Sequence, residues 1–220
     1  FFNICNYNKL NKIVQKHKPE YVFHLAAQAI VSTSLKDPIN TFSSNLMGTV
    51  NILQSLRNLS AVTAIIVTSD KCYKNLETYR GYNETDILFG SDPYSASKSC
   101  AEIAFKSYCD SFFDIKTHRL ASCRAGNVIG GGDFSNDRLF PDIFKSFFMK
   151  KKLIIRNQKS TRPWQHVLEP VIGYMTLAKK LKSNIELSHS SYNFGPSSKK
   201  HYSVGDILDC VSKLIKIEVI

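Results

Sequence analysis

Residues 63–71 read Thr-Ala-Ile-Ile-Val-Thr-Ser-Asp-Lys, a short apolar run that ends in hydroxyl groups, an acid and an amine. A continuous run of this length is typical of a strand that is buried on both faces of a parallel sheet. Polar side chains that directly follow such a strand lie at its carboxyl end, where sheets of this kind bind ligands. We therefore predict a strand over 63–68 and a functional site that begins at Ser69.

Strands and helices alternate on both sides of this segment, which predicts an α/β fold. The expected strands of the first half are 21–26, 63–68 and 116–122, and the expected helices are 9–16, 41–59 and 93–113. We predict that the three strands are parallel neighbours in one sheet. The regularity falls after Gly130-Gly131-Gly132, which we interpret as a turn rather than a phosphate loop. The later expected helices are 139–149, 167–181 and 204–216, and the later extended segments are 153–156 and 192–194.

Tyr94 and Lys98 stand four residues apart in 92–98, Asp-Pro-Tyr-Ser-Ala-Ser-Lys. Pro93 suits the first turn of a helix, and residues four apart share one helix face. A nearby ammonium group favours the phenolate and would lower the pKa of Tyr94 from its normal value near 10. Tyr94 is therefore a candidate proton acceptor for an alcohol. The alternative is that both residues lie on an exposed helix surface without a chemical role.

Composition argues for an enzyme domain and against several other classes of protein. No apolar run approaches the roughly 18 residues that a membrane helix needs. The six cysteines show no Cys-x-x-Cys pattern or paired histidine spacing, so we expect reduced thiols in a cytoplasmic protein and no metal site. The net charge of +11 is diffuse and belongs to no recognisable nucleic-acid module. A positive field would also attract a nucleotide-sugar diphosphate.

Four further segments carry motifs of one family. They are 21–28 (Tyr-Val-Phe-His-Leu-Ala-Ala-Gln), 45–51 (Asn-x-x-Gly-Thr-x-Asn), 124–133 (Arg-Ala-Gly-Asn-Val-Ile-Gly-Gly-Gly-Asp) and 162–167 (Arg-Pro-Trp-Gln-His-Val). With the Tyr-x-x-x-Lys pair, these segments resemble the extended short-chain dehydrogenase/reductase family. The combined motifs are similar to those of its nucleotide-sugar 4,6-dehydratases of the CDP-glucose type.

This resemblance implies an NAD-dependent lyase that acts on CDP-glucose. The reaction oxidises C4, eliminates water across C5 and C6 and returns the hydride to C6. The catalytic residues implied are Ser69, Asp70, Lys71, Tyr94 and Lys98. Epimerases of the family need no acid–base pair at Asp70 and Lys71, so Asp70 favours a dehydratase. An exposed pair of charges at a strand end is the plain alternative for these two residues.

The resemblance also implies binding residues and an assembly. The residues expected to contact NAD are Leu25, Ala26, Ala27, Gln28, Asn45, Thr68, Tyr94 and Lys98. Those expected to contact the nucleotide sugar are Asn127, Arg138, Arg162 and His166. We expect a Rossmann-type NAD-binding domain over 1–130 and part of a smaller substrate-binding lobe over 131–220. A homodimer is expected because members of the family commonly pair.

One departure from the family's pattern changes the expected fold. A dinucleotide-binding domain carries a glycine-rich turn after its first strand, and no such segment precedes residue 21. We therefore expect an incomplete Rossmann-type sheet without the first βαβ unit, in a chain that is a piece of a longer protein. Two alternatives stay open. The chain belongs either to another nucleotide-sugar dehydratase or epimerase, or to a non-catalytic fragment that does not hold NAD.

Overall fold

The computed structural model describes residues 3–78, 80–196 and 201–215. These residues form two compact units that are not continuous in sequence. The first unit contains Phe1–Ala125 and Val171–Phe194, and the second contains Gly126–Pro170 and Gly195–Ile220. The chain therefore returns to the first unit after residue 170, whereas the sequence predicted a single boundary at residue 130.

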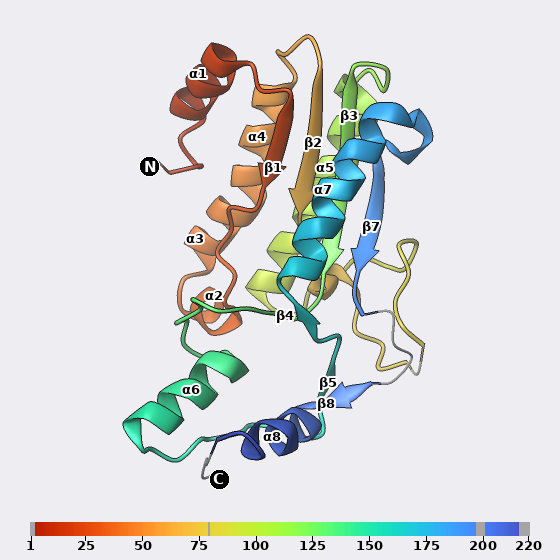
Figure 1. Ribbon diagram of the computed structural model, residues 1–220. Helices are drawn as coiled ribbons and strands as arrows, with labels where there is room; N and C mark the ends of the chain where they lie inside the picture. The colour runs from red at the N-terminus through yellow and green to blue at the C-terminus, as the bar shows by residue number, and fades with distance from the viewer. Residues whose placement is uncertain (1–2, 79, 197–200, 216–220) are drawn as a thin grey trace. The chain divides into compact units, whose positions relative to one another are not determined.

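The first unit is built on a four-stranded parallel sheet (Figure 1). Its strands are β1 (Tyr21–His24), β2 (Val62–Val67), β3 (His118–Ala125) and β7 (Ser190–Phe194), in the order β1-β2-β3-β7. All three pairings are parallel, with Phe23 opposite Ile65 and Ile65 opposite Ala121. The predicted parallel neighbours are confirmed, and so is the α/β class. The sequence had also identified part of β7 as extended.

Helices cover both faces of this sheet, as Figure 1 shows. On one face, α1 (Tyr7–His17), α4 (Gly48–Leu56) and α5 (Pro93–Phe112) form a core with buried β2 and β3 side chains. On the other face, α7 (Leu168–Ser183) packs against β3 and β7. Alternate residues of β2 point into opposite cores, since Ile66 joins the first cluster and Ile65 the second. This two-sided burial explains the continuous apolar run in the sequence.

The predicted helix over 41–59 is largely confirmed, since the chain is helical without a break from Pro38 to Leu56, although this helix consists of three segments with different hydrogen bonding. They are α3 (Pro38–Phe42), a π-helical turn (Ser43–Met47) and α4, and α2 (Val31–Lys36) precedes them. Asn45 lies in the π-helical turn, where its side-chain amide bonds backbone atoms of Gln28 and the hydroxyl of Ser97. Single π-helical turns occur inside α-helices and are frequent at functional sites. An amphipathic pattern does not reveal such a local change in hydrogen bonding.

The described residues of the second unit form short strands and the helices α6 and α8. Strand β4 (Val128–Ile129) pairs in parallel with β6 (Gln165–His166), and β5 (Thr161–Arg162) pairs antiparallel with β8 (Tyr202–Ser203). Helices α6 (Leu139–Met149) and α8 (Val204–Ser212) contribute to a small core around Ile143, Leu153 and Leu208.

Two sequence predictions for the second unit need correction. The segment 153–156 forms no regular strand: Leu153 makes a single β-bridge and packs in the small core with Ile143 and Leu208, and the residues after it are irregular. The last helix begins at Val204, where Ser203 and Asp206 form a capping box, and ends at Ser212 rather than at 216. Residue 216 itself lies outside the described residues. Within the described part of the chain, no helix has both the length and the apolar character needed to cross a membrane.

Candidate active site

The carboxyl end of β2 turns into a short 3-10 helix, η2 (Asp70–Cys72), which holds three of the candidate residues close together. The hydroxyl of Ser69 accepts a hydrogen bond from the backbone N–H of Lys71 at 3.2 Å and donates one to Asp70 at 3.1 Å. Ser69 is buried, Asp70 is partly exposed and Lys71 is exposed. The strand end therefore presents a hydroxyl, a carboxyl group and an amine in one turn.

Helix α5 supplies the second half of the site. Pro93 occupies the first turn, as the sequence predicted, and Asp92 caps the helix by accepting from the N–H of Ser95. Tyr94 and Lys98 are both buried on the same helix face. The backbone N–H of Tyr94 donates to the Ser34 hydroxyl at 3.2 Å, which ties this helix start to α2.

Contacts between α5 and the end of β2 bring the two halves together. The Lys98 ammonium donates to the carbonyl oxygen of Val67 at 3.4 Å. The Lys71 ammonium lies 5.9 Å from the ring centroid of Tyr94. The Ser99 hydroxyl donates to the carbonyl oxygen of Cys72 at 2.9 Å. Ser69, Asp70, Lys71, Tyr94 and Lys98 therefore belong to adjoining segments, while the predicted common cleft stays a prediction.

The charge of Lys98 depends on a balance of burial and attraction. Burial lowers the pKa of Lys98 to about 8, while the negative charge of Glu102 acts in the opposite direction. His24 lies nearby on β1, and burial, together with the charge of Lys98, lowers its pKa to about 4. His24 is therefore neutral at pH 7 and forms a 3.1 Å hydrogen bond with the Thr49 hydroxyl.

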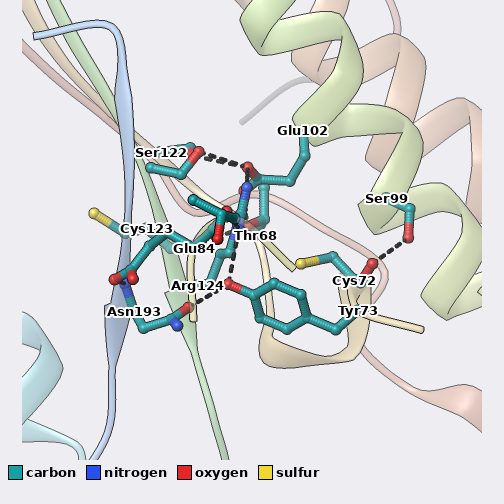
Figure 2. A network of polar contacts seen from close by, with 12 residues as sticks. Thr68, Cys72, Tyr73, Glu84, Ser99, Glu102, Ser122, Cys123, Arg124 and Asn193 are labelled. Carbon is teal, nitrogen blue, oxygen red and sulfur yellow. Dashed lines mark hydrogen bonds and ion pairs between the residues drawn. The ribbon is translucent and has the colours of Figure 1, made fainter. Parts of the chain in front are cut away.

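A buried polar network joins helix α5 to the sheet next to the end of β2 (Figure 2). Glu102 of α5 and Arg124 of β3 form an ion pair at 2.6 Å, and their side chains are 1% and 4% exposed. The second oxygen of Glu102 accepts a hydrogen bond from the Thr68 hydroxyl at the end of β2. Hydroxyl groups of Ser122 and Ser191 also donate to Glu102, at 2.9 and 3.0 Å. One carboxylate thus joins α5 to three strands of the sheet.

Arg124 extends the network into the loop that follows η2. Its guanidinium donates to the Tyr73 hydroxyl at 2.7 Å and to the carbonyl oxygen of Glu84 at 3.0 Å. The Tyr73 hydroxyl donates in turn to Asn193 on β7 at 2.7 Å, as Figure 2 shows. Burial alone would lower the pKa of Arg124, but its bond to Glu102 outweighs this effect and raises it. Arg124 therefore stays a buried cation held by one carboxylate.

Sequence reasoning missed Glu102 and cited Arg124 only as part of a motif. A signal for Glu102 was present, since it follows Lys98 by four residues and so continues the Tyr94/Lys98 face of the helix. An acidic residue on a helix face that is otherwise buried needs a cationic or hydrogen-bonding partner. No sequence pattern identified Arg124 as that partner, because the two residues meet only in the folded sheet.

The candidate cofactor residues fall into two groups. Leu25, Ala26 and Ala27 follow β1 and are exposed, so their backbone can approach a ligand. The other group is engaged within the protein: Gln28 bonds Thr41 and Asn45, and the Thr68 hydroxyl bonds Glu102. This second group supports the site's backbone. These residues fit the nicotinamide half of NAD. A buried lysine and a tyrosine can bond the ribose hydroxyls, and the exposed backbone after β1 leaves room for the nicotinamide ring.

The candidate substrate residues all lie in the second unit. The guanidinium of Arg138 contacts Asp133 at 3.3 Å, and that of Arg162 donates to the carbonyl oxygen of Thr161 at 2.7 Å. The carbonyl oxygen of Asn127 accepts from Gln165, and the ring of His166 accepts from the N–H of Leu168. The contacts of Arg138, Arg162 and His166 are local in sequence, whereas that of Asn127 joins the segment before β4 to β6. Among the described residues, no group of three His, Cys, Asp or Glu side chains could hold a metal ion.

The comparison with protein families decides the classification. The GDP-mannose 4,6 dehydratase family matches residues 2–212. The chain belongs to this family. The match covers both units, including every candidate catalytic and substrate-binding residue.

Individual relatives agree with this classification. The chain is 45% identical over 213 residues to CDP-glucose 4,6-dehydratase of Salmonella typhimurium, a match that covers 94% of this chain and 59% of that protein. It is 27% identical to dTDP-D-glucose 4,6-dehydratase of Dictyostelium discoideum, which covers 99% of this chain and 49% of that protein. The chain thus spans about half to three fifths of the length of these relatives.

Solved structures confirm the Rossmann-type fold. A dTDP-glucose 4,6-dehydratase of Bacillus anthracis, in complex with NAD, matches with a TM-score of 0.82 at 20% identity, over 100% of this chain and 66% of that one. A UDP-glucose 4-epimerase of Thermus thermophilus, also in complex with NAD, matches with a TM-score of 0.84 at 20% identity, over 100% of this chain and 70% of that one. At this identity the likeness establishes the fold.

Proposed function

We propose that the protein is an NAD-dependent nucleotide-sugar 4,6-dehydratase that acts on CDP-glucose. The observation that carries this proposal is the acid–amine pair Asp70 and Lys71 at the end of β2, next to the buried Tyr94 and Lys98 of α5. The similarity to the Salmonella enzyme supports CDP-glucose as the substrate.

Tyr94 is proposed to accept the proton of the C4 hydroxyl group. The ammonium of Lys98 favours the phenolate form of Tyr94 by its positive charge and can donate to hydroxyls of the nicotinamide ribose. Ser69 is proposed to hydrogen-bond the same sugar hydroxyl as Tyr94. When bound, NAD would accept the hydride from C4 and return it to C6.

Asp70 and Lys71 are proposed to perform the elimination. A ketone at C4 acidifies the proton on C5, so a base must remove that proton and an acid must protonate the departing C6 hydroxyl group. We assign the acid to Asp70 and the base to Lys71. A lysine acts as a base only when it is neutral, which burial or nearby positive charge favours. Lys71 is exposed in this structure, so a substrate bound over it would have to supply that burial.

The remaining assignments follow from the same proposal. Backbone of 25–28, supported by Asn45 and Thr68, would contact the nicotinamide half of NAD. Arg162, Arg138, Asn127 and His166 would bind the nucleotide and its diphosphate, because guanidinium groups suit phosphate oxygens. We further propose a homodimer in the cytoplasm that binds no nucleic acid.

The test uses a chimera in which the 220-residue chain replaces the segment of the Salmonella enzyme that aligns with it. CDP-glucose should lose one water in mass and yield a 4-keto sugar, and dTDP-glucose and UDP-glucose should react more slowly. Tyr94→Phe should lower turnover by at least about 10²-fold, as expected for a general base. Tyr108→Phe is the matched control, because Tyr108 lies on the same helix and bonds Gln54 outside the site.

Each alternative has a distinct result. Formation of the C4 epimer without loss of water would identify an epimerase. Equal turnover of Tyr94→Phe and Tyr108→Phe would refute the role of Tyr94. For the 220-residue chain alone, we expect weak or no NAD binding in isothermal titration, since no glycine-rich turn precedes residue 21 to hold the pyrophosphate. Micromolar affinity would contradict that expectation.

A further inference from the structure

The Glu102 cluster is defined as Glu102, Arg124, Thr68, Ser122 and Ser191. Apart from Thr68, which is proposed to support the NAD site, its members have no part in the proposed function. Its side chains are buried or partly buried, and none is a candidate proton donor or acceptor for the sugar. Replacing a buried ion pair by well-packed apolar residues is often neutral or even stabilising. The stability of the fold alone therefore does not explain why Glu102 and Arg124 form a buried ion pair at this position.

The position of the cluster relates it to the candidate site. Tyr94, Lys98 and Glu102 follow at intervals of four residues on α5, so they form one row along the helix. Glu102 bonds Thr68, the residue directly before Ser69, while Lys98 bonds the carbonyl oxygen of Val67. Successive residues of one helix face therefore hold successive residues of one strand end.

Electrostatics relate the cluster to Lys98 as well. Titratable groups around Lys98 come from three elements: Tyr94 and Glu102 from α5, Cys72 from η2 and His24 from β1. Burial raises the pKa of the Cys72 thiol, and burial together with Lys98 lowers that of His24, so both are neutral at pH 7. The carboxylate of Glu102 is the charge that opposes the effect of burial on Lys98.

We propose that Glu102 is a positioning residue, which holds the Tyr94/Lys98 face of α5 on the end of β2 and keeps the buried lysine protonated. Arg124 holds the carboxylate in place and prevents it from turning toward Lys98 to form a direct ion pair. Lys98 then keeps its proton and its freedom to bond a ligand. The use of that lysine rests on the proposed function, whereas its charge state is measurable in the protein alone.

The test is an NMR titration of isotope-labelled lysine side chains in the full 220-residue chain. The Lys98 signal is assigned from its loss in Lys98→Met. An opposite charge near an ionisable group typically shifts a pKa by about 1–3 units, so Glu102→Gln should lower the Lys98 midpoint by about one pH unit. Asp110→Asn is the matched control, because it removes a carboxylate from the same helix in an exposed pair with Lys106. That variant should leave the midpoint unchanged.

A second variant covers the case in which Glu102→Gln does not fold, since it leaves Arg124 without its partner. The double variant Glu102→Met/Arg124→Met replaces both charges with apolar side chains of similar size, and the Lys98 midpoint should fall there too. An unchanged midpoint in a folded variant, or an equal fall in Asp110→Asn, overturns the proposal. Failure of both variants to fold also overturns the proposal, because the Glu102 cluster would then be required for folding itself. Neither NAD nor substrate is needed, so an error in the proposed function would not alter these outcomes.

Discussion

The end of β2 and the second unit hold their candidate residues in different ways. Behind Ser69, Tyr94 and Lys98 lies a continuous buried network that connects α5 with β2, β3 and β7. In the second unit, Arg138 contacts a neighbouring carboxylate and is partly exposed, and Arg162 contacts a neighbouring carbonyl group and is exposed.

This difference matches the two tasks in the proposed function. Proton transfer requires groups that are held in a fixed geometry before the substrate arrives. Recognition of a diphosphate by arginine requires accessible guanidinium groups, which can gain order when the ligand binds. On the proposed function, the fold would pre-organise the residues that perform proton transfer, while the arginines proposed to bind the diphosphate are held by single contacts.

The largest expected effect is the loss of stability in Glu102→Ala. Removing one partner of a buried ion pair leaves the other charge without compensation, which typically costs about 3–5 kcal/mol in the free energy of unfolding. Urea titration followed by circular dichroism measures this change. The control Glu102→Met/Arg124→Met should recover most of the loss. A change below about 1 kcal/mol in Glu102→Ala would indicate an exposed pair of the kind that contributes little.

The next effect is a dependence of stability on acid pH that comes from His24. Its pKa is about 4 in the folded chain, against about 6.5 for an unperturbed histidine. Between these values the unfolded state binds more protons, so the free energy of unfolding falls as pH drops from about 6.5 to about 4. The full loss is on the order of 3 kcal/mol. In His24→Gln this part of the pH dependence should disappear, whereas a steep slope retained in that variant would assign it to other groups.

The smallest effect is expected in the second unit. The Arg138–Asp133 pair spans 3.3 Å, and its side chains are 39% and 31% exposed. Solvent screens such a pair, so Arg138→Ala should change the free energy of unfolding by less than about 1 kcal/mol. The same urea titration compares it with Glu102→Ala. A loss as large as that of Glu102→Ala would remove the distinction between the two regions.

Sequence reasoning identified the candidate site better than it identified the site's support. The strand end at Ser69 and the helix that carries Tyr94 and Lys98 were both predicted, because an apolar run and a proline at a helix start are local signals. The π-helical turn at Asn45 was missed, since it depends on hydrogen bonds to Gln28 and Ser97. The periodicity of apolar residues gives no information about hydrogen bonds between segments that are distant in the chain.

The amino-acid sequence by itself determined the parallel sheet, the family and the row of Tyr94 and Lys98 on one helix face. These features depend on residue types at short spacings, which backbone geometry converts directly into structure. Only the tertiary structure decided that α7 and β7 belong to the first unit and that Glu102 pairs with Arg124. The physical reason is that a buried charge needs a partner, and the choice of partner is made by which strands and helices pack together.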